Sequence, residues 1–232
     1  MRQLRSDLAF VNPNVQFSFR ESVEPVYRQL VSLLLLDETE SDQQKNLLKA
    51  QDAIKSLQLA ELVNFFRSDC LSSAQVDISQ VDRTAAVVYP ILLEDRLEVI
   101  LSLPNQPLRH YASSFTETQI DEIVTNLRVD LRDPSSLDYL SNAHKLCDWL
   151  IRPATDGIAK SQIKTIVFVL DGSLRNIPMS VLHDGKQFVA ENYSIALTPG
   201  LQLIDPKPHC QAKSHRSNSR ANRISTRIFG SS

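Results

Sequence analysis

The chain has 232 residues, enough for one large domain with a sizeable core. Its 42% hydrophobic and 22% charged residues and its net charge of -2 are typical of a globular cytosolic protein and exclude a strongly basic or acidic specialist. No apolar run approaches the roughly 20 residues of a membrane span, and the first residues contain no apolar signal region, so we expect a cytoplasmic protein. Three cysteines, Cys70, Cys147 and Cys210, are too few for a disulfide framework.

The first part of the chain predicts a helical hairpin. Apolar residues recur at helical spacing from about Val23 to residue 36, and Pro25 is tolerated in the first turn of that helix. A second apolar stripe runs from residue 42 to about residue 68, with charged and amide side chains on its other side. The polar loop at 37–41 is short enough for the two helices to pack antiparallel.

Strands are expected next. Segments 85–93 and 96–103 predict a β-hairpin that turns at residues 94–95, and a short third strand is predicted at 108–111. Pro90 lacks a backbone donor, so we expect an edge or a bulge at that point of the first strand.

Two helices follow the hairpin. Thr116 and Gln119 have the spacing of a capping box, and the helix that they begin should end at residues 133–134. Ser135 is predicted to cap the next helix, and Pro153 is predicted to stop it.

The apolar run at 166–170 predicts a strand that is buried on both faces, in the middle of an α/β sheet. It ends at Asp171-Gly172, and ligands of open α/β sheets gather beyond such carboxyl ends. Short strands are then predicted at 181–182 and 188–189, around a turn at 183–186, and again at 193–197.

The last residues differ in composition from the rest. Residues 209–232 are rich in Ser, Asn and Arg and are predicted to be disordered. They contain no acidic residue, and their basic residues are Lys213, Arg216, Arg220, Arg223 and Arg227. Dispersed positive charges without aromatic residues between them do not predict nucleic-acid binding.

Four phrases stand out: VDRTAAVVYPILLEDRLEVILSLPNQPLRHY, LCDWLIRP, IKTIVFVLDGSLRNIPMSVLHDGKQFVAENYSIALTP and LQLIDPKP. They resemble the amino-terminal part of a CHAT domain, the caspase-like domain that is associated with TPR repeats and is frequent in cyanobacteria. The earlier phrases VQFSFRESVEPVYRQLVSLLL and LQLAELVNFFRSDC resemble the helical segment that precedes the domain in the same proteins.

This resemblance covers about residues 4–208 and implies an α/β fold, an incomplete caspase-like α/β sandwich preceded by an α-helical hairpin. It divides the chain into three parts. Residues 1–80 would be the end of a TPR-associated helical region, residues 81–208 the amino-terminal part of a CHAT domain, and residues 209–232 the basic tail.

The resemblance also implies cysteine peptidase chemistry by a His-Cys dyad. In the family the histidine stands in a small-residue-His-Gly context and the cysteine in a Ser-Ala-Cys-like context, both downstream of the matched segment, and neither phrase occurs here. Loss of either partner removes most of the rate of such an enzyme. We therefore expect a truncated family member that is not an enzyme as encoded, with a shifted reading frame or premature end as the origin of the tail.

No catalytic, cofactor-binding or metal-binding residue is assigned, and no cofactor is expected. The alternative function is a non-catalytic protein-protein interaction module that uses the helical hairpin. Neither a nucleic acid nor a membrane is expected as a partner, and the oligomeric state is left open. A sheet without its later strands would leave 166–170 along an edge, which predicts poor solubility of the isolated chain.

Two pairs of residues are the strongest site candidates. His144 and Cys147 lie three residues apart on one predicted helix, but Cys147 falls on its apolar stripe, where a free cysteine is usually inert. Asp171 and Arg175 flank the carboxyl end of the central strand. For them we favour a turn aspartate and an arginine that pairs locally or covers the sheet edge, with substrate positioning as the alternative.

The other candidates have weaker patterns. His183 is expected to be a solvated turn histidine, and Trp149 is expected in the core. Several further residues have no partner at a functional or zinc-binding spacing: His110, Cys70, His209, Cys210 and His215.

Overall fold

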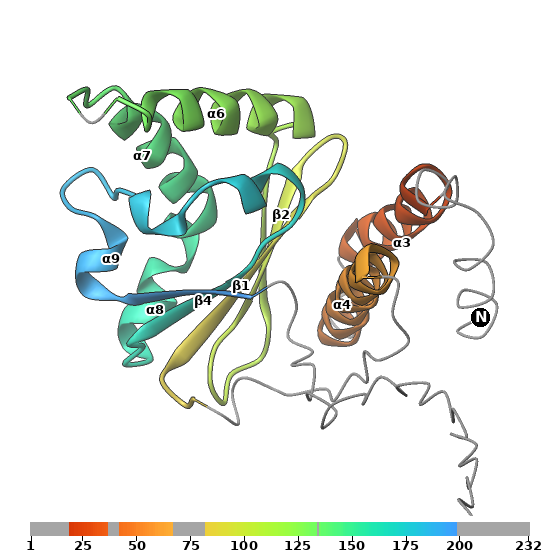
Figure 1. The fold of residues 1–232 in the computed structure, drawn as a ribbon. Coiled ribbons are helices and arrows are strands. Elements are labelled where there is room, and N and C mark those ends of the chain that lie inside the picture. The colour runs from red at the N-terminus through yellow and green to blue at the C-terminus, as the bar shows by residue number, and fades with distance from the viewer. Residues whose placement is uncertain (1–18, 37–41, 67–81, 134, 199–232) are drawn as a thin grey trace, which may run out of the picture.

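A five-stranded mixed sheet forms the centre of the chain, with helices on both of its faces (Figure 1). The computed structural model describes residues 19–36, 42–66, 82–133 and 135–198. The α/β class predicted from the sequence is confirmed.

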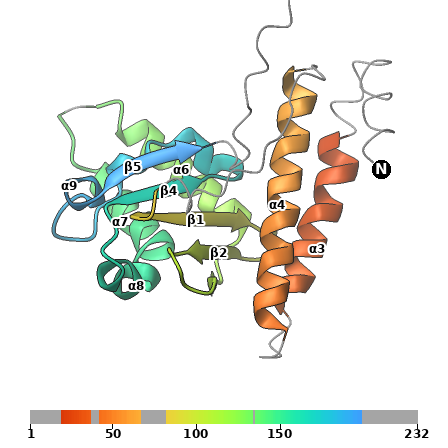
Figure 2. The same cartoon turned by 90° about the horizontal axis from the view of Figure 1, so that it is seen from below.

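The strands are arranged in the order β3-β2-β1-β4-β5 (Figure 2). Strands β1, β4 and β5 are parallel, whereas β2 is antiparallel to both of its neighbours. Their bounds are β1 Ala85–Leu92, β2 Leu97–Ser102, β3 Arg109–Ser113, β4 Thr165–Val169 and β5 Ser194–Thr198.

Strand β4 is buried over almost its full length, as its unbroken apolar run predicted. The expectation that residues 166–170 lie along an edge is wrong, because β4 pairs with β1 on one side and with β5 on the other. Strand β5 is the edge instead, and its Leu197 is 54% exposed. Because β4 is paired on both sides, its backbone offers no open edge of the kind that promotes aggregation.

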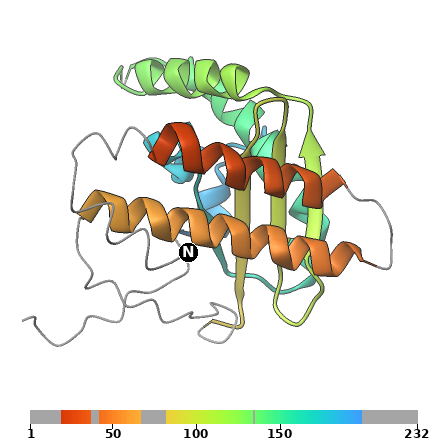
Figure 3. The ribbon, with the colours of Figure 1, turned by 90° about the vertical axis from the view of Figure 1, so that its right-hand side faces the viewer.

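The predicted helical hairpin lies flat on one face of the sheet. It consists of α3 (Glu24–Leu36), which follows the π-helical turn Phe19–Val23, and α4 (Gln43–Phe66). Figure 3 shows the two helices side by side, running across the strands. Their apolar faces share one buried cluster with the sheet: Val31, Leu35, Leu47, Ala50, Ala53, Ile54, Ala85, Val87, Tyr89, Ile91, Leu93, Ile100, Val167 and Val169.

The opposite face of the sheet is covered by α6 (Glu117–Asp130), α7 (Tyr139–Leu150) and α8 (Thr155–Lys160). The capping box of Thr116 and Gln119 is confirmed. The cap predicted at Ser135 is wrong, because this residue bonds to Asp133 and α7 begins four residues later.

Trp149 is 9% exposed and stacks on Phe115, with ring centroids 4.0 Å apart, so its predicted place in the core is confirmed.

The segment after β4 contains three short helical turns, and two of them replace the strands predicted at 181–182 and 188–189. The bounds of these turns are Gly172–Asn176, Met179–Val181 and, for α9, Val189–Asn192. The predicted hairpin at 181–189 is reduced to a single bridge between His183 and Phe188. Short apolar pairs do not distinguish a strand from one helical turn, and here both turns pack against β5 and against each other.

The shared core predicts that the helical hairpin and the sheet unfold together. Ile54, 1% exposed on α4, packs on one face of the sheet, whereas Trp149 lies on the other. We expect Ile54→Ala to lower the free energy of unfolding by about 2–4 kcal/mol because it leaves a cavity. The transition should be followed in urea by Trp149 fluorescence. Leu48→Ala, at a leucine of α4 that is 52% exposed, is the control and should change little. An unchanged Trp149 transition in Ile54→Ala would show that the two layers unfold separately.

Candidate charged site at the carboxyl ends of β1 and β4

A buried carboxylate stands two residues after the end of β4. Asp171 is 2% exposed and forms a bidentate salt bridge with the guanidinium group of Arg28 on α3. Arg28 Nη1 donates to Asp171 Oδ2 at 2.7 Å, and Nη2 donates to Oδ1 at 3.0 Å. Such a bidentate geometry combines two charge-assisted hydrogen bonds and fixes the relative orientation of the two groups. It joins two residues that are 143 positions apart in the sequence.

The same two side chains also hold β1. Arg28 Nη1 donates to the carbonyl of Leu92 at 2.6 Å, and the Leu92 amide donates to Asp171 Oδ2 at 3.1 Å. Glu24, one turn earlier on α3, accepts from Arg28 Nη2 at 2.6 Å and from Nε at 2.9 Å. Burial alone would lower the pKa of Arg28, but the hydrogen bonds and charges of Asp171 and Glu24 raise it above its ordinary value. Arg28 is therefore a permanent cation.

Pro90 explains why a side chain is needed at this point. The β1–β4 pairing extends only as far as Val88 and Phe168. The Leu92 amide points to the β4 side, and Pro90, two residues earlier, faces the same side without a donor. β1 thus has an unpaired edge only from Pro90 onward, on the side of β4. There Asp171 accepts the hydrogen bond of the Leu92 amide that β4 does not.

Gly172 lets the chain turn away beside this carboxylate. It has φ of +50°, and a Cβ there would lie 2.7 Å from Leu92 Cδ1. Any other residue would be strained in this conformation and would clash with β1. The Asp-Gly dipeptide therefore has a structural cause, although Asp171 makes a long-range contact that its turn-like sequence did not predict.

Arg175 forms a second bridge to the helical layer. Its Nε donates to the Leu170 carbonyl at 3.0 Å, and its Nη2 donates to Glu61 Oε2 of α4 at 2.8 Å. Burial raises the pKa of Glu61, and the charge and hydrogen bond of Arg175 oppose that rise. Burial also raises the pKa of Glu117, which lies near Arg28. Asp171 and Arg175 are thus brought to one end of the sheet, where both bind residues of the helical hairpin.

The other pair of candidates forms no dyad. Cys147 is 2% exposed, and burial raises its pKa to about 12, so its thiol is neutral near pH 7. His144 Nε2 lies 3.1 Å from Arg152 Nη2 and 3.7 Å from Asp148 Oδ1. A cysteine nucleophile needs a thiolate, which this environment disfavours.

Two more histidines are placed by the structure. His183 Nδ1 accepts from the Gly185 amide at 3.1 Å in the expected turn. His110 has a partner that we did not predict, because its Nε2 lies 2.5 Å from Oε2 of Glu98, a residue 2% exposed. Ile100 of β2 pairs with His110 of β3, so their side chains share one face of the sheet. Glu98, two residues before Ile100, lies on the same face and therefore next to His110. The hairpin register could have revealed this contact.

Cys70, His209, Cys210 and His215 lie outside the described residues. Within the described ranges, no group of three or more His, Cys, Asp or Glu side chains could hold a metal ion. In the same ranges, no helix has both the length and the apolar content to cross a membrane.

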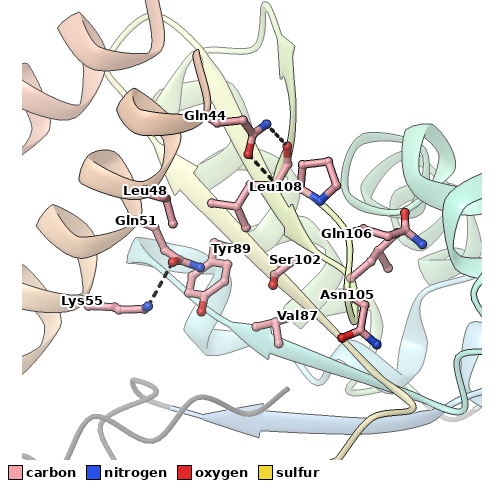
Figure 4. A pocket seen from close by; sticks show the side chains of 12 residues that line it. Gln44, Leu48, Gln51, Lys55, Val87, Tyr89, Ser102, Asn105, Gln106 and Leu108 are labelled. Atoms are coloured by element: carbon pink, nitrogen blue, oxygen red, sulfur yellow. Dashed lines mark hydrogen bonds between the residues drawn. The ribbon is translucent and has the colours of Figure 1, made fainter. Parts of the chain in front are cut away.

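A cavity of about 340 Å³ lies between α4, the first half of β1 and the loop that joins β2 to β3 (Figure 4). Gln44 exchanges two hydrogen bonds with the backbone of Leu108, at 2.7 and 3.0 Å, and so acts like a neighbouring strand. Gln51 Oε1 accepts from Lys55 Nζ at 3.0 Å. None of the residues singled out from the sequence lines this cavity.

The charged cluster predicts a measurable coupling between α3 and β4. Asp171→Ala should lower the free energy of unfolding by about 3 kcal/mol, because it leaves Arg28 without its buried partner. In a double-mutant cycle with Arg28→Ala, the paired change should cost clearly less than the sum of the single changes. The exposed pair of Arg152 and Asp148 is the control, and its loss should cost less than about 1 kcal/mol. Additive effects of Asp171→Ala and Arg28→Ala would contradict this account.

Comparison with known families gives one match. Residues 140–226 match the family model of the CHAT domain, a caspase-like family. The match begins within α7, covers β4 and β5, and extends past Pro208 into the segment predicted as a tail. No curated protein matches the chain. The match confirms the resemblance found in the sequence over residues 140–226, and the mixed sheet is consistent with a partial caspase-like α/β fold.

Proposed function

We propose that the chain, as given, is a CHAT domain protein without peptidase activity. The observation that supports this most directly is Cys147, which is 2% exposed and has a pKa raised to about 12 by burial. The sequence contexts in which the family carries its histidine and cysteine do not occur in the 232 residues. The chain would keep the family's α/β scaffold and lack its dyad.

The origin of the tail is part of the same proposal. We propose a truncated CHAT domain in which residues 209–232 follow a shifted reading frame or a premature end. The family match reaches residue 226 and does not by itself favour a break at 208. Reading the nucleotides after the codon for Pro208 in all three frames tests this point. His-Gly and Ser-Ala-Cys phrases in another frame would support the break, and their absence would sink it.

The alternative function is a protein-protein interaction module. It is favoured by the outer side of the hairpin, where Leu33 is 68% exposed and Leu48 is 52% exposed. Since the inner faces of α3 and α4 are packed on the sheet, a partner would have to contact the outer faces. Binding of a purified partner should then be lost in Leu33→Lys. A partner that binds the variant equally well does not use this surface.

Lack of peptidase activity is tested with the full chain and fluorogenic peptides that contain basic residues. We expect no hydrolysis above the buffer blank, either by the wild type or by Cys147→Ala. Hydrolysis that Cys147→Ala abolishes would overturn the proposal. Hydrolysis that persists in this variant would point to a contaminating peptidase.

Cys147 should also be protected from alkylation. With Cys70→Ser and Cys210→Ser it is the remaining thiol, and iodoacetamide at pH 8 should label it only after unfolding. Its folded pKa lies above the ordinary value of 9.0, so its contribution to stability is fully present below pH 9 and is lost as the pH rises towards 12. Labelling in the folded state at the rate of a free thiol would contradict the burial that the proposal uses.

A further inference from the structure

The cavity between α4, the first half of β1 and the loop that joins β2 to β3 has the size of a small-molecule site. Its volume of about 340 Å³ falls in the range of roughly 300–1,000 Å³ that is usual for ligand pockets. An apolar cavity of roughly 150 Å³ is already large enough to bind benzene. There is therefore room for an aromatic ring and one further group.

Hydrogen bonds of the chain itself hold the walls of this cavity. Gln44 of α4 fixes the loop that joins β2 to β3, because it exchanges two hydrogen bonds with the Leu108 backbone at 2.7 and 3.0 Å. Gln106 fixes the same loop from the other side, since its Nε2 donates to Ser161 Oγ at 2.7 Å. Asn105 has φ of +56°, a left-handed conformation that asparagine tolerates better than most residues. Walls that are held in place in this way lower the cost of binding a ligand.

One wall of the cavity carries a positive charge. The side chain of Lys55 on α4 is 18% exposed, and its Nζ donates to Gln51 Oε1 at 3.0 Å. The same Nζ lies 5.9 Å from the centre of the Tyr89 ring and 3.8 Å from Oδ1 of Asp52, whose side chain is 65% exposed (Figure 4). Among the described residues that line the cavity, Lys55 is the one charged side chain. Its ammonium group favours an anion in the cavity.

The rest of the lining is largely apolar. Val87 of β1 pairs with Ser102 of β2, so both side chains lie on the face of the sheet that α4 covers. The loop adds Leu103, Pro107 and Leu108. An apolar ligand body can lie on these groups, and the Ser102 hydroxyl can either donate or accept a hydrogen bond.

We propose that this cavity binds a small organic carboxylate, with the carboxylate group on Lys55 and the apolar body on Val87 and Leu108. One ammonium group balances the single charge of a carboxylate. A phosphate group carries about -1.5 to -2 charges near pH 7, which exceeds the charge of this lining. The apolar part of the lining selects against small inorganic anions, which have no apolar surface to bury.

The site is separate from the charged cluster at the carboxyl ends of β1 and β4. A ligand bound there would touch both α4 and the loop that joins β2 to β3, and so would add a contact between the helical hairpin and the sheet. A ligand that binds only the folded chain also stabilises it. The proposal does not depend on whether the chain is a peptidase.

The test is a titration of the isotope-labelled full chain with benzoate, followed by two-dimensional NMR. The backbone amide signals of Val87, Ser102 and Leu108 should shift and reach saturation. Benzamide, a neutral compound of nearly the same shape, should bind at least about tenfold more weakly, because it cannot form an ion pair with Lys55. This comparison uses the wild type and needs no variant to fold.

Two lysine variants of α4 provide a matched comparison. Lys55→Met removes the charge and keeps most of the apolar stem, so it should weaken benzoate binding at least about tenfold and change benzamide binding little. Lys49→Met, at an exposed lysine of the same helix that does not line the cavity, should leave both affinities unchanged. Ser102→Leu should fill the cavity and abolish the binding of both compounds. The Trp149 transition in urea checks that each variant is folded.

Three results would overturn the proposal. Benzoate that leaves the amide signals of Val87, Ser102 and Leu108 unshifted does not bind in this cavity. Equal affinities for benzoate and benzamide would show that the cavity does not recognise the charge. Equal losses of benzoate affinity in Lys55→Met and Lys49→Met would assign the effect to the overall charge of α4.

Discussion

A single buried carboxylate connects the helical layer to the sheet. Asp171 accepts hydrogen bonds from Arg28 of α3 and from the Leu92 amide of β1, and it stands two residues after the end of β4. Burying such a pair is costly, so its net contribution to stability is modest when compared with an apolar contact of the same shape. Removing one partner is costly as well, because the other charge stays buried. The apolar cluster beneath α3 and α4 supplies most of the attraction, and we infer that the salt bridge fixes where α3 lies along the strands.

The charged side chains at the carboxyl ends of β1 and β4 have a structural role, because they attach the helical hairpin to the sheet. Asp171 and Arg175 stand where α/β proteins commonly bind ligands, yet both are bound to residues of the helical hairpin. The thiol of Cys147 lies in the core on the other side of the sheet, on the buried face of α7. The likeness of residues 140–226 to the CHAT domain is consistent with the α/β scaffold, while the positions of these residues support a proposal of no peptidase activity for the chain as given.

Local patterns predicted local structure well, and contacts between distant residues were missed. The apolar run of β4, the capping box at Thr116 and the helical hairpin were all predictable, because each depends on neighbouring residues. The Asp171 contact with Arg28 was not, because Asp-Gly has the same appearance in a solvated turn and in a buried bridge. The central position predicted for β4 is confirmed, but the expectation that it would lie along an edge was wrong, since the pairing of β5 depends on the fold of the segment between them.

We infer from the shared core that α3, α4 and the sheet form one cooperative unit. Native-state hydrogen exchange in increasing urea tests it most directly, because it gives an opening free energy for each protected amide. We expect the amides of α3 and α4 to merge with those of β1 and β4 into one unfolding transition of the same free energy and urea dependence. If the amides of α3 and α4 instead open at a clearly lower free energy while β1 and β4 stay protected, the helical layer is a separate unit and the account is wrong.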